Sequence, residues 1–486
     1  MWIATSDGAV LMPDSMSYIG AAESLHGQGT LRIPMADWND ADSTSSLQQF
    51  PPGYSIVLAA ARRLGATAMQ APRIVAALAS AGSILLLVAV FVWCRVGWWS
   101  LAAPFVLLSV RGVTSGALTA LSEPLFVVTV LLTLCLMVRY PHRAWTYGLA
   151  AACGSMVRYV GVALVASAVV YAFAYVVRGT RRDITRALGS ATLAGMPGVV
   201  LIGAWQLRAR ANATSTPMTD LRWSGNASVA LHDGLQTIVS QMVPFGMNEF
   251  VRAFLATFVG IVALGSVVRA WRQPRSVPHD AFGRLIFASL LLSAGLFAVI
   301  LYARLFVGDA IPFDDRILAP ALLCAIIGAF AATVRVSAWR GRTLAAGWLV
   351  MAAVAAILNA TNMMIEREDY GAAAWQQSTS ATWLRTYAKR CTVFTNDPVA
   401  VYFATGRPSR VLPMSLATDS ILQFAAHVRQ TRGLIVQYSA AFIDMADAGA
   451  MAHAIGLIAT HFSDSTVVWT NAQVPCTSLS ISQHTL

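Results

Sequence analysis

Long runs of apolar residues, separated by short polar turns, fill most of the chain between residues 71 and 360. A helix needs about 20 apolar residues to cross the ~30 Å hydrocarbon core of a bilayer. Ten runs approach that length, and the two short ones, at 98 and 144, are typical of tilted or partial spans. The pattern predicts a polytopic α-helical membrane protein with about ten spans, at about 71–94, 98–111, 120–138, 144–158, 160–177, 187–207, 249–268, 283–304, 317–334 and 343–360.

The residues before the first run are polar. Residues 13–50 are rich in Asp, Ser, Gln and Gly, and a connection of this length without regular structure is usually functional or disordered. The apolar stretch that follows, at 54–64, carries Arg62 and Arg63. It is too short to cross the hydrocarbon core, so we expect an interfacial helix there.

From about residue 361 the composition changes to that of a soluble domain. Three runs rich in β-branched residues have strand character and alternate with helical stretches, which is typical of a small α/β domain. These runs are CTVFTN at 391–396, GLIVQYS at 433–439 and STVVWTN at 465–471. We therefore divide the chain into a transmembrane domain at 1–360, with an outer loop at 13–54, and an α/β domain at 361–486.

Composition and charge agree with a membrane protein. Hydrophobic residues make up 57% of the 486 residues and charged residues only 12%, with a formal net charge of +11. The basic residues lie in turns between apolar runs, whereas a nucleic-acid-binding protein clusters them on a soluble face, so we expect no nucleic-acid partner. By the positive-inside rule the arginine-rich turns are cytoplasmic. That orientation places the 13–54 loop and the C-terminal domain outside the cytoplasmic (inner) membrane.

Asp14 begins the polar loop. Asp is a favoured N-cap residue, and the pattern permits a helix from Ser15 to Leu25. From this position alone we favour the cap. The alternative is a carboxylate that faces a cavity and takes part in chemistry.

Two charged residues lie at the outer ends of predicted spans. Glu123 stands between Ser122 and Pro124, and a carboxylate near hydrocarbon is a candidate functional group unless it is solvated at the helix end. Arg158 interrupts an apolar stretch, and Tyr159 beside it suits the membrane interface. A structural ion pair between Glu123 and Arg158 is the alternative to a binding role.

The motif Asp314, Asp315 and Arg316 precedes the span at 317–334. The planar guanidinium of an arginine suits a phosphate group. An exposed turn with a local Asp to Arg pair is the alternative. Two adjacent aspartates also admit a divalent metal, although nothing in the sequence fixes the remaining ligands.

The order of five motifs resembles that of bacterial GT-C glycosyltransferases, in the branch that includes dolichyl-phosphate-mannose protein mannosyltransferases and the aminoarabinose transferase of lipid A. The motifs are DSMSYIGAA at 14–22, FPPGYSIVLAA at 50–60, LSEPLF at 121–126, RYVG at 158–161 and DDRILAP at 314–320. The stretch VFTNDPVAVYFATGRPSRVLP at 393–413 is also similar to the extracytoplasmic domain of family members.

The resemblance implies an inverting transfer of a hexose or pentose from a polyprenyl-phosphate donor to a glycan, lipid or protein acceptor of the bacterial cell envelope. On that pattern the 13–54 loop is catalytic, Asp14 is the general base or a carboxylate that orients the acceptor, and Glu123 is the second acidic residue. Arg158 and Arg316 bind the donor phosphate. The supporting residues are Tyr18, Tyr54, Tyr159, Asp314 and Asp315.

A multi-span transporter or lipid flippase is the alternative function, because many spans with intramembrane charges describe those proteins too. A transporter needs charges near the midplane of the bilayer. Here the charges lie at helix ends and accompany a long outer loop, which favours an enzyme.

Cys391 and Cys476 lie in the C-terminal region, where each flanks a strand-like run. Outside the cytoplasm, disulfides form and persist. We expect a disulfide between Cys391 and Cys476, with two separate thiols as the alternative.

Overall fold

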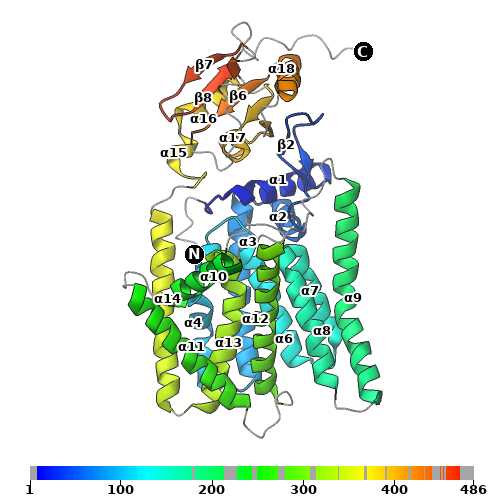
Figure 1. Cartoon of the computed structure of the whole chain (residues 1–486), viewed down its shortest axis with the longest axis vertical. Helices are drawn as coiled ribbons and strands as arrows, with labels where there is room; N and C mark the ends of the chain where they lie inside the picture. The colour runs from blue at the N-terminus through cyan, green and yellow to red at the C-terminus, as the bar shows by residue number, and fades with distance from the viewer. Residues whose placement is uncertain are drawn as a thin grey trace. The chain divides into compact units, whose positions relative to one another are not determined.

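The computed structural model describes residues 8–177, 181–212, 227–242, 249–271, 280–306, 313–337, 339–365, 369–388, 391–413, 418–431, 433–439, 449, 452–453 and 456–470. The chain forms two compact units (Figure 1). The first contains Gln48–Tyr54 and Pro72–Ile365, and the second contains Asp7–Leu47, Ser55–Ala71 and Glu366–Leu486.

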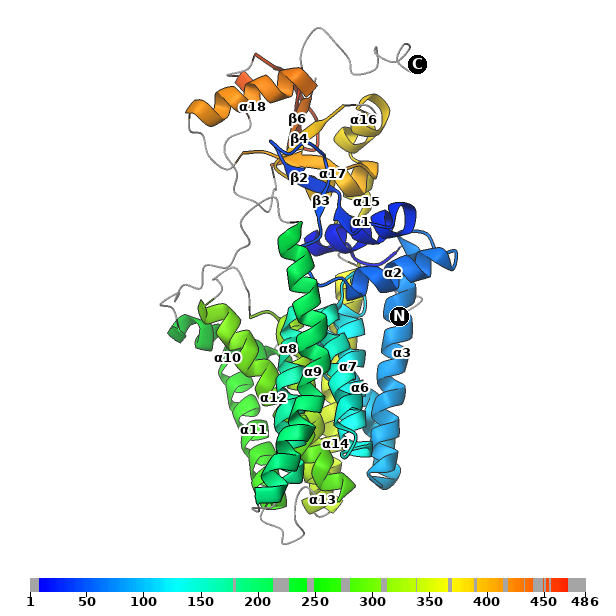
Figure 2. The same cartoon turned by 90° about the vertical axis from the view of Figure 1, so that its right-hand side faces the viewer.

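The first unit is helical, and each of the ten predicted apolar segments lies in helical structure. In both views its long helices run side by side (Figures 1 and 2). They are α3 (Gln70–Trp93), η1 (Gly97–Ala102), α4 (Ala103–Leu108), α5 (Arg111–Gly116), α6 (Glu123–Arg139), α7 (Ala144–Val157), η2 (Tyr159–Gly161), α8 (Val162–Val176), α9 (Arg181–Ala211), α10 (Ala227–Met242), α11 (Glu249–Trp271), α12 (Ala281–Phe306), α13 (Asp315–Val336) and α14 (Trp339–Ile365).

Six helices within the described ranges are long and apolar enough to cross a membrane, and they include α3, α12, α13 and α14. In hydrocarbon every backbone N–H and C=O must be satisfied within the protein, which is why apolar runs of this length form helices. The prediction of a polytopic α-helical membrane protein is confirmed. In the most apolar 18-residue stretch of each helix, 83% is buried in α13 and 22% in α14. Helix α13 is therefore central and α14 peripheral.

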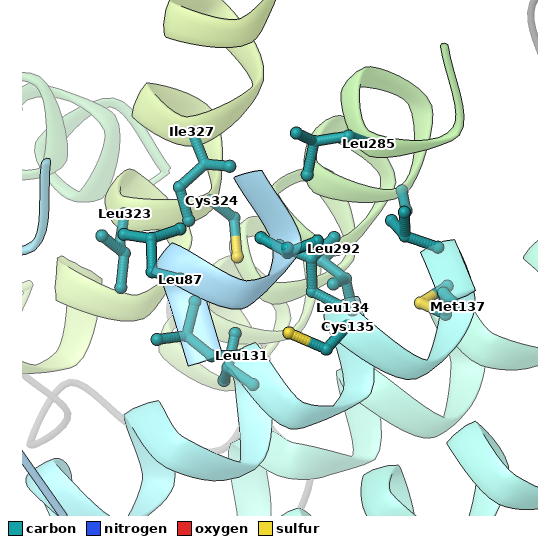
Figure 3. Packing of buried hydrophobic residues seen from close by; sticks show 14 of the residues in the cluster. Leu87, Leu131, Leu134, Cys135, Met137, Leu285, Leu292, Leu323, Cys324 and Ile327 are labelled. Atoms are coloured by element: carbon teal, nitrogen blue, oxygen red, sulfur yellow. The ribbon is translucent and has the colours of Figure 1, made fainter. Parts of the chain in front are cut away.

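Leucine-rich faces of α3, α6, α12 and α13 meet in the core of this unit (Figure 3). Leu87, Leu134, Leu292 and Leu323 are fully buried there. Water does not drive helices together inside a bilayer, so close packing and small residues at the contacts stabilise such a bundle. At Gly148, for example, a Cβ atom would lie 2.3 Å from the carbonyl oxygen of Ala194, so only glycine lets α7 and α9 approach this closely.

The second unit combines a mixed sheet with short helices. The sheet has strand order β2-β5-β4-β6-β8-β7, in which β2, β5, β4 and β6 are parallel and β8 and β7 are antiparallel. Its elements are α1 (Pro13–Gln28), β1 (Arg32–Ile33), β2 (Met35–Asp37), β3 (Ser45–Ser46), the larger part of α2 (Gly53–Arg63), α15 (Ala373–Gln376), α16 (Thr379–Tyr387), β4 (Val393–Thr395), α17 (Pro398–Thr405), β5 (Ser409–Val411), α18 (Thr418–Thr431), β6 (Leu434–Gln437), β7 (Ile458–His461) and β8 (Val467–Thr470).

The predicted strand runs became β4, β6 and β8, so the expected small α/β domain is present. In the polar segment after residue 13, helix α1 covers the stretch from Ser15 to Leu25 where the sequence permits a helix. The segment differs from the expected loop because three short strands follow this helix. Its strand β2 pairs with β5 in the register Met35 to Ser409 and Asp37 to Val411. Residues 13–47 therefore belong to the same compact unit as the C-terminal domain. A three-residue strand carries too little periodicity to reveal such a long-range pairing.

Candidate functional site

Glu123 and Arg158 form an ion pair in the first unit. Glu123 is the first residue of α6, and its Oε1 lies 2.5 Å from Nη1 of Arg158. The side chains are 7% and 22% exposed, respectively. Nη1 of Arg158 also donates to Oγ of Ser122 at 3.5 Å. The ion pair considered from the sequence is thus present in the structure.

The backbone at Arg158 explains how a cation comes to lie among apolar helices. Helix α7 ends at Val157, and Arg158 is extended, with φ −145° and ψ 140°. The chain turns back through a hydrogen bond from the Gly161 N–H to the carbonyl of Arg158, at 2.8 Å. A Cβ at Gly161 would lie 2.5 Å from the carbonyl carbon of Gly154, so the turn requires glycine there. This break between α7 and η2 presents the Arg158 side chain to the start of α6.

The second carboxylate oxygen of Glu123 is the chemically distinctive atom of the pair. Oε2 is buried and receives no hydrogen bond from any residue that the structure describes. A buried acceptor without a donor costs about 1 to 3 kcal/mol, and more when it is charged. A bound hydroxyl or amine that donates to Oε2 would remove this cost.

A second group of charges surrounds the start of α13. Asp314 caps the helix by accepting from the Ile317 N–H at 2.8 Å, and its Oδ2 lies 3.0 Å from Nη2 of Arg316. The local Asp to Arg pair is therefore present, with both side chains about one quarter exposed. Asp315 instead pairs with Nε of Arg111 at 3.0 Å.

Arg111 is a charged neighbour that the sequence interpretation missed. It begins α5, a six-residue helix in a stretch assigned to the end of an apolar span. The signal was an arginine at the outer end of that run, on the side where Asp315 was expected. A Cβ at Gly112 would lie 1.9 Å from the carbonyl oxygen of Asp315, so α5 packs directly on α13.

Helix α5 also contacts the ion pair of Glu123 and Arg158. A Cβ at Gly116, at the far end of α5, would contact the Cβ of Glu123 at 3.2 Å. Six helical residues extend only about 9 Å. The Glu123 and Arg158 pair and the Asp315 and Arg111 pair are therefore connected by one short helix at a single end of the helical unit.

Tyr159 holds the segment Gln48–Tyr54 at this end of the unit. Its hydroxyl donates to the carbonyl of Gln48 and accepts from Nε1 of Trp205, each at 3.0 Å. A Cβ at Gly53 would lie 2.5 Å from the carbonyl oxygen of Met156, two residues before the break at Arg158. Tyr54, only 1% exposed, follows in the same segment. Tyr159 thus fixes the segment beside Arg158.

Asp14 and Tyr18 lie on α1, in the second unit. The N-cap prediction for Asp14 is wrong: Met12 is the N-cap, and the Met12 N–H donates to Oγ of Ser15 at 2.9 Å. Asp14 occupies the first turn of the helix, where the helix dipole favours a carboxylate, and is half-buried. Tyr18 is buried, 3% exposed. The carboxylate of Asp14 therefore does not cap helix α1.

Metal ligation was considered for Asp314 and Asp315. In the described parts of the chain, no group of three or more His, Cys, Asp or Glu side chains gathers in a way that could hold a metal ion. Both aspartates instead contact arginines, Arg316 and Arg111.

The expected disulfide involves Cys391 and Cys476. Cys391 is disulfide-bonded, and it lies just before β4. Cys476 lies outside the described residues. The pairing of these two cysteines stays a prediction.

Two solved structures are similar to this chain over nearly its whole length. ArnT from Cupriavidus metallidurans bound to undecaprenyl phosphate has a TM-score of 0.56 at 13% sequence identity and covers 96% of this chain and 95% of that chain. The apo state of ArnT from the same organism has a TM-score of 0.50 at 12% identity, with the same coverage. No protein-family model and no curated protein matches the chain. Together with the arrangement of its helices and small sheet, this likeness shows that the chain has the fold of ArnT.

Proposed function

We propose that this protein is a membrane glycosyltransferase of the GT-C type. It takes a sugar from a polyprenyl-phosphate donor and transfers it, with inversion, to a glycan, lipid or protein acceptor on the outer side of the cytoplasmic membrane. The observation that carries this proposal is the shared fold over 96% of this chain with ArnT, a protein whose structure contains undecaprenyl phosphate. In this proposal the C-terminal domain is extracytoplasmic.

The charges at one end of the helical unit support a lipid-phosphate site. A polyprenyl phosphate combines a hydrocarbon tail with an anion at the membrane surface. Arg158 lies at a helix break among apolar helices, and its pair with Glu123 holds the planar guanidinium in one orientation. Such a preorganised fork suits a phosphate. In the proposed site Arg158 contacts the donor phosphate, and Arg316 is the second cation.

In the proposed site Glu123 supplies a hydrogen-bond acceptor for the donor sugar. Its buried Oε2 accepts no hydrogen bond from the described residues, so a hydroxyl or amino group of the donor sugar would complete its hydrogen bonding. This contact would orient the sugar relative to the phosphate that Arg158 holds. Binding a polar group here costs little, because the carboxylate oxygen is already desolvated.

The transfer itself needs a base beside the acceptor hydroxyl and a cation beside the departing phosphate. Asp14 takes the proton from the acceptor hydroxyl while the acceptor oxygen attacks the anomeric carbon. The bond from the anomeric carbon to the phosphate oxygen breaks with inversion, and the polyprenyl phosphate leaves with the bonding electrons. Arg158 and Arg316 stabilise the negative charge that develops on it.

The test uses the purified chain in lipid nanodiscs with a panel of polyprenyl-phosphate sugars and envelope acceptors. We expect undecaprenyl phosphate to bind, as measured by native mass spectrometry, and Arg158→Met to weaken that binding. Arg340→Met is the matched control, because Arg340 is exposed at the start of α14, at the opposite end from Asp315.

Equal binding by the wild type and Arg158→Met would contradict the assigned phosphate site. The flippase alternative has its own signature, because a flippase would move labelled polyprenyl-phosphate sugar across a proteoliposome membrane without transferring the sugar.

A further inference from the structure

Strand β2 is an unusual edge of the C-terminal sheet, because it comes from the N-terminal polar segment. Among the described strands it pairs with β5 alone, in parallel and over three residues, with Ala36 opposite Arg410. Short parallel edge pairs are weak, since few hydrogen bonds hold them. Another interaction is needed to keep β2 on the sheet.

Arg410 supplies that interaction from the middle of β5. Its side chain is buried, with the residue only 4% exposed. Nη1 donates to the carbonyl of Trp38 at 3.2 Å, and Nη2 donates to the carbonyl of Ala41 at 2.9 Å. Nη1 also contacts Nε2 of His427 on α18. One guanidinium thus joins the turn after β2 to two elements of the C-terminal domain.

Trp38 adds an apolar contact at the same place. Its ring packs edge-on against Phe424, with centroids 5.8 Å apart, and against His427 at 6.5 Å. Phe424 is fully buried in the core beneath the sheet, where Phe394 also lies. The turn after β2 is therefore anchored by one buried cation and one aromatic ring.

The residues just before β2 pack against the helix that carries Asp14. Pro34, just before β2, lies so close to α1 that a Cβ at Gly20 would be 2.2 Å from its Cδ atom. The carbonyl of Pro34 also accepts from the Ser409 N–H at 3.2 Å. At the other end of α1, Glu23 pairs with Arg62 of α2, with 2.5 Å between Oε1 and Nε.

We propose that Arg410 is a positioning residue that fixes helix α1, and with it Asp14, by clamping the β2 turn onto the C-terminal sheet. The C-terminal domain then serves the reaction by holding the base in place, although Arg410 touches neither donor nor acceptor. The kinetic part of this inference rests on the proposed transfer, whereas the structural part does not.

The side chain is costly to bury, which argues for a role beyond packing. A buried charge needs full hydrogen bonding to be tolerated, yet Nε of Arg410 has no partner among the described residues. Apolar residues of similar size often stabilise such sites as well or better. The planar fork instead gives a defined orientation, because one group binds two carbonyls of the same turn.

The experiment compares Arg410→Met and Arg410→Lys with the full-length wild type in nanodiscs. Arg429→Met is the control, since Arg429 is an exposed arginine on α18. Hydrogen exchange followed by mass spectrometry reports the opening of residues 13–28 and 32–47. Loss of a charged hydrogen-bond set should raise exchange there by about ten- to hundredfold in Arg410→Met, with partial recovery in Arg410→Lys.

Kinetics separate positioning from general destabilisation. We expect Arg410→Met to lower kcat about tenfold or more while the affinity for undecaprenyl phosphate stays at the wild-type value. Unchanged exchange at 13–28 would overturn the inference, and so would raised exchange with a wild-type kcat. If the wild type transfers no sugar, the proposed function fails, but exchange at 13–28 still decides whether Arg410 holds α1.

Discussion

Oε1 of Glu123 lies 2.5 Å from Nη1 of Arg158, although the two residues stand 35 positions apart in an apolar stretch of the chain. The reason is the hairpin of α6 and α7, two helices of 17 and 14 residues that pack against each other. An antiparallel pair brings the start of the first helix to the end of the second. The two charges therefore meet at one end of the bundle, where each offsets the desolvation of the other.

Arg158→Met should destabilise the folded protein by about 3 to 5 kcal/mol, because it leaves a buried, uncompensated carboxylate at Glu123. The double variant Glu123→Gln with Arg158→Met should recover most of that loss. Unfolding in mixed detergent micelles, followed by tryptophan fluorescence, measures both. Equal stability of the single and double variants would mean that the pair is not coupled.

Asp14→Asn should abolish sugar transfer while leaving the fold intact. An amide cannot take the proton of the acceptor hydroxyl, and Asp14 makes no N-cap whose loss would unfold α1. Transfer is measured with purified protein, and circular dichroism checks the fold. Normal turnover by Asp14→Asn would remove Asp14 from the mechanism.

Arg316→Ala should weaken donor binding more than it lowers stability. Its pair with Asp314 is local, between residues two apart in one turn, and local pairs near the surface contribute about 0 to 1 kcal/mol to folding. A charged hydrogen bond to phosphate contributes about 1.5 to 3 kcal/mol. Titration with undecaprenyl phosphate gives the affinity. An unchanged affinity would favour a purely local role in the turn.

Arg111→Met provides the comparison for Arg316→Ala. Arg111 pairs with Asp315 between two helices, α5 and α13, whereas Arg316 and Asp314 are two residues apart in one turn. Because only the Arg111 pair joins separate elements, this variant should lower stability more than Arg316→Ala does. Thermal unfolding of the two variants under the same conditions ranks them. A larger loss in Arg316→Ala would contradict the role of the Arg111 pair in joining α5 to α13.

The clamp around Arg410 should weaken in acid. Burial and the neighbouring Arg410 lower the pKa of His427 below its ordinary value of 6.5, and Nε2 must be unprotonated to accept from Arg410. Burial lowers the pKa of Arg410, and the carboxylates of Asp40 and Asp42 oppose this shift by favouring its charged form. The contribution of neutral His427 to the free energy of unfolding is therefore fully present above pH 6.5, where His427 is neutral in the folded and unfolded states. It is lost as the pH falls through the pKa of His427 in the folded state.

His427→Gln tests this pH dependence, because a glutamine oxygen can accept the same hydrogen bond but does not titrate. We expect exchange at residues 32–47, corrected for the intrinsic effect of pH, to rise in acid for the wild type and to stay level for His427→Gln. The same rise in both proteins would assign the acid effect to other groups.

Cys391 and Cys476 should be joined in the unreduced protein. Closing a loop of this length stabilises a domain by about 4 to 5 kcal/mol in the chain-entropy picture. Mass spectrometry of unreduced peptides should find the two cysteines linked, and reduction should lower the unfolding temperature of the C-terminal domain. Free, alkylatable thiols at both positions would contradict the bridge and one support for the outer location of the domain.

Sequence alone determined the class of fold, for a physical reason. Hydrocarbon requires long apolar helices with internally satisfied backbones, so a run such as 317–334 indicates a helix without any knowledge of its neighbours. The β-branched runs indicate strands in a similar way, and they became β4, β6 and β8. Local patterns also identified Glu123, Arg158 and Arg316 as charges in unexpected places.

Only the tertiary structure decided which of these groups meet. Glu123 pairs with Arg158, whereas Asp315 pairs with Arg111, a residue that the sequence interpretation did not select. The polar segment after Asp14 contributes β2 to a sheet whose other strands come from beyond residue 390. Strand pairing and ion pairing join residues that are remote in the chain, and their geometry depends on how whole elements pack. A sequence pattern reports the preference of each segment, while the partners are chosen by the packing of the folded chain.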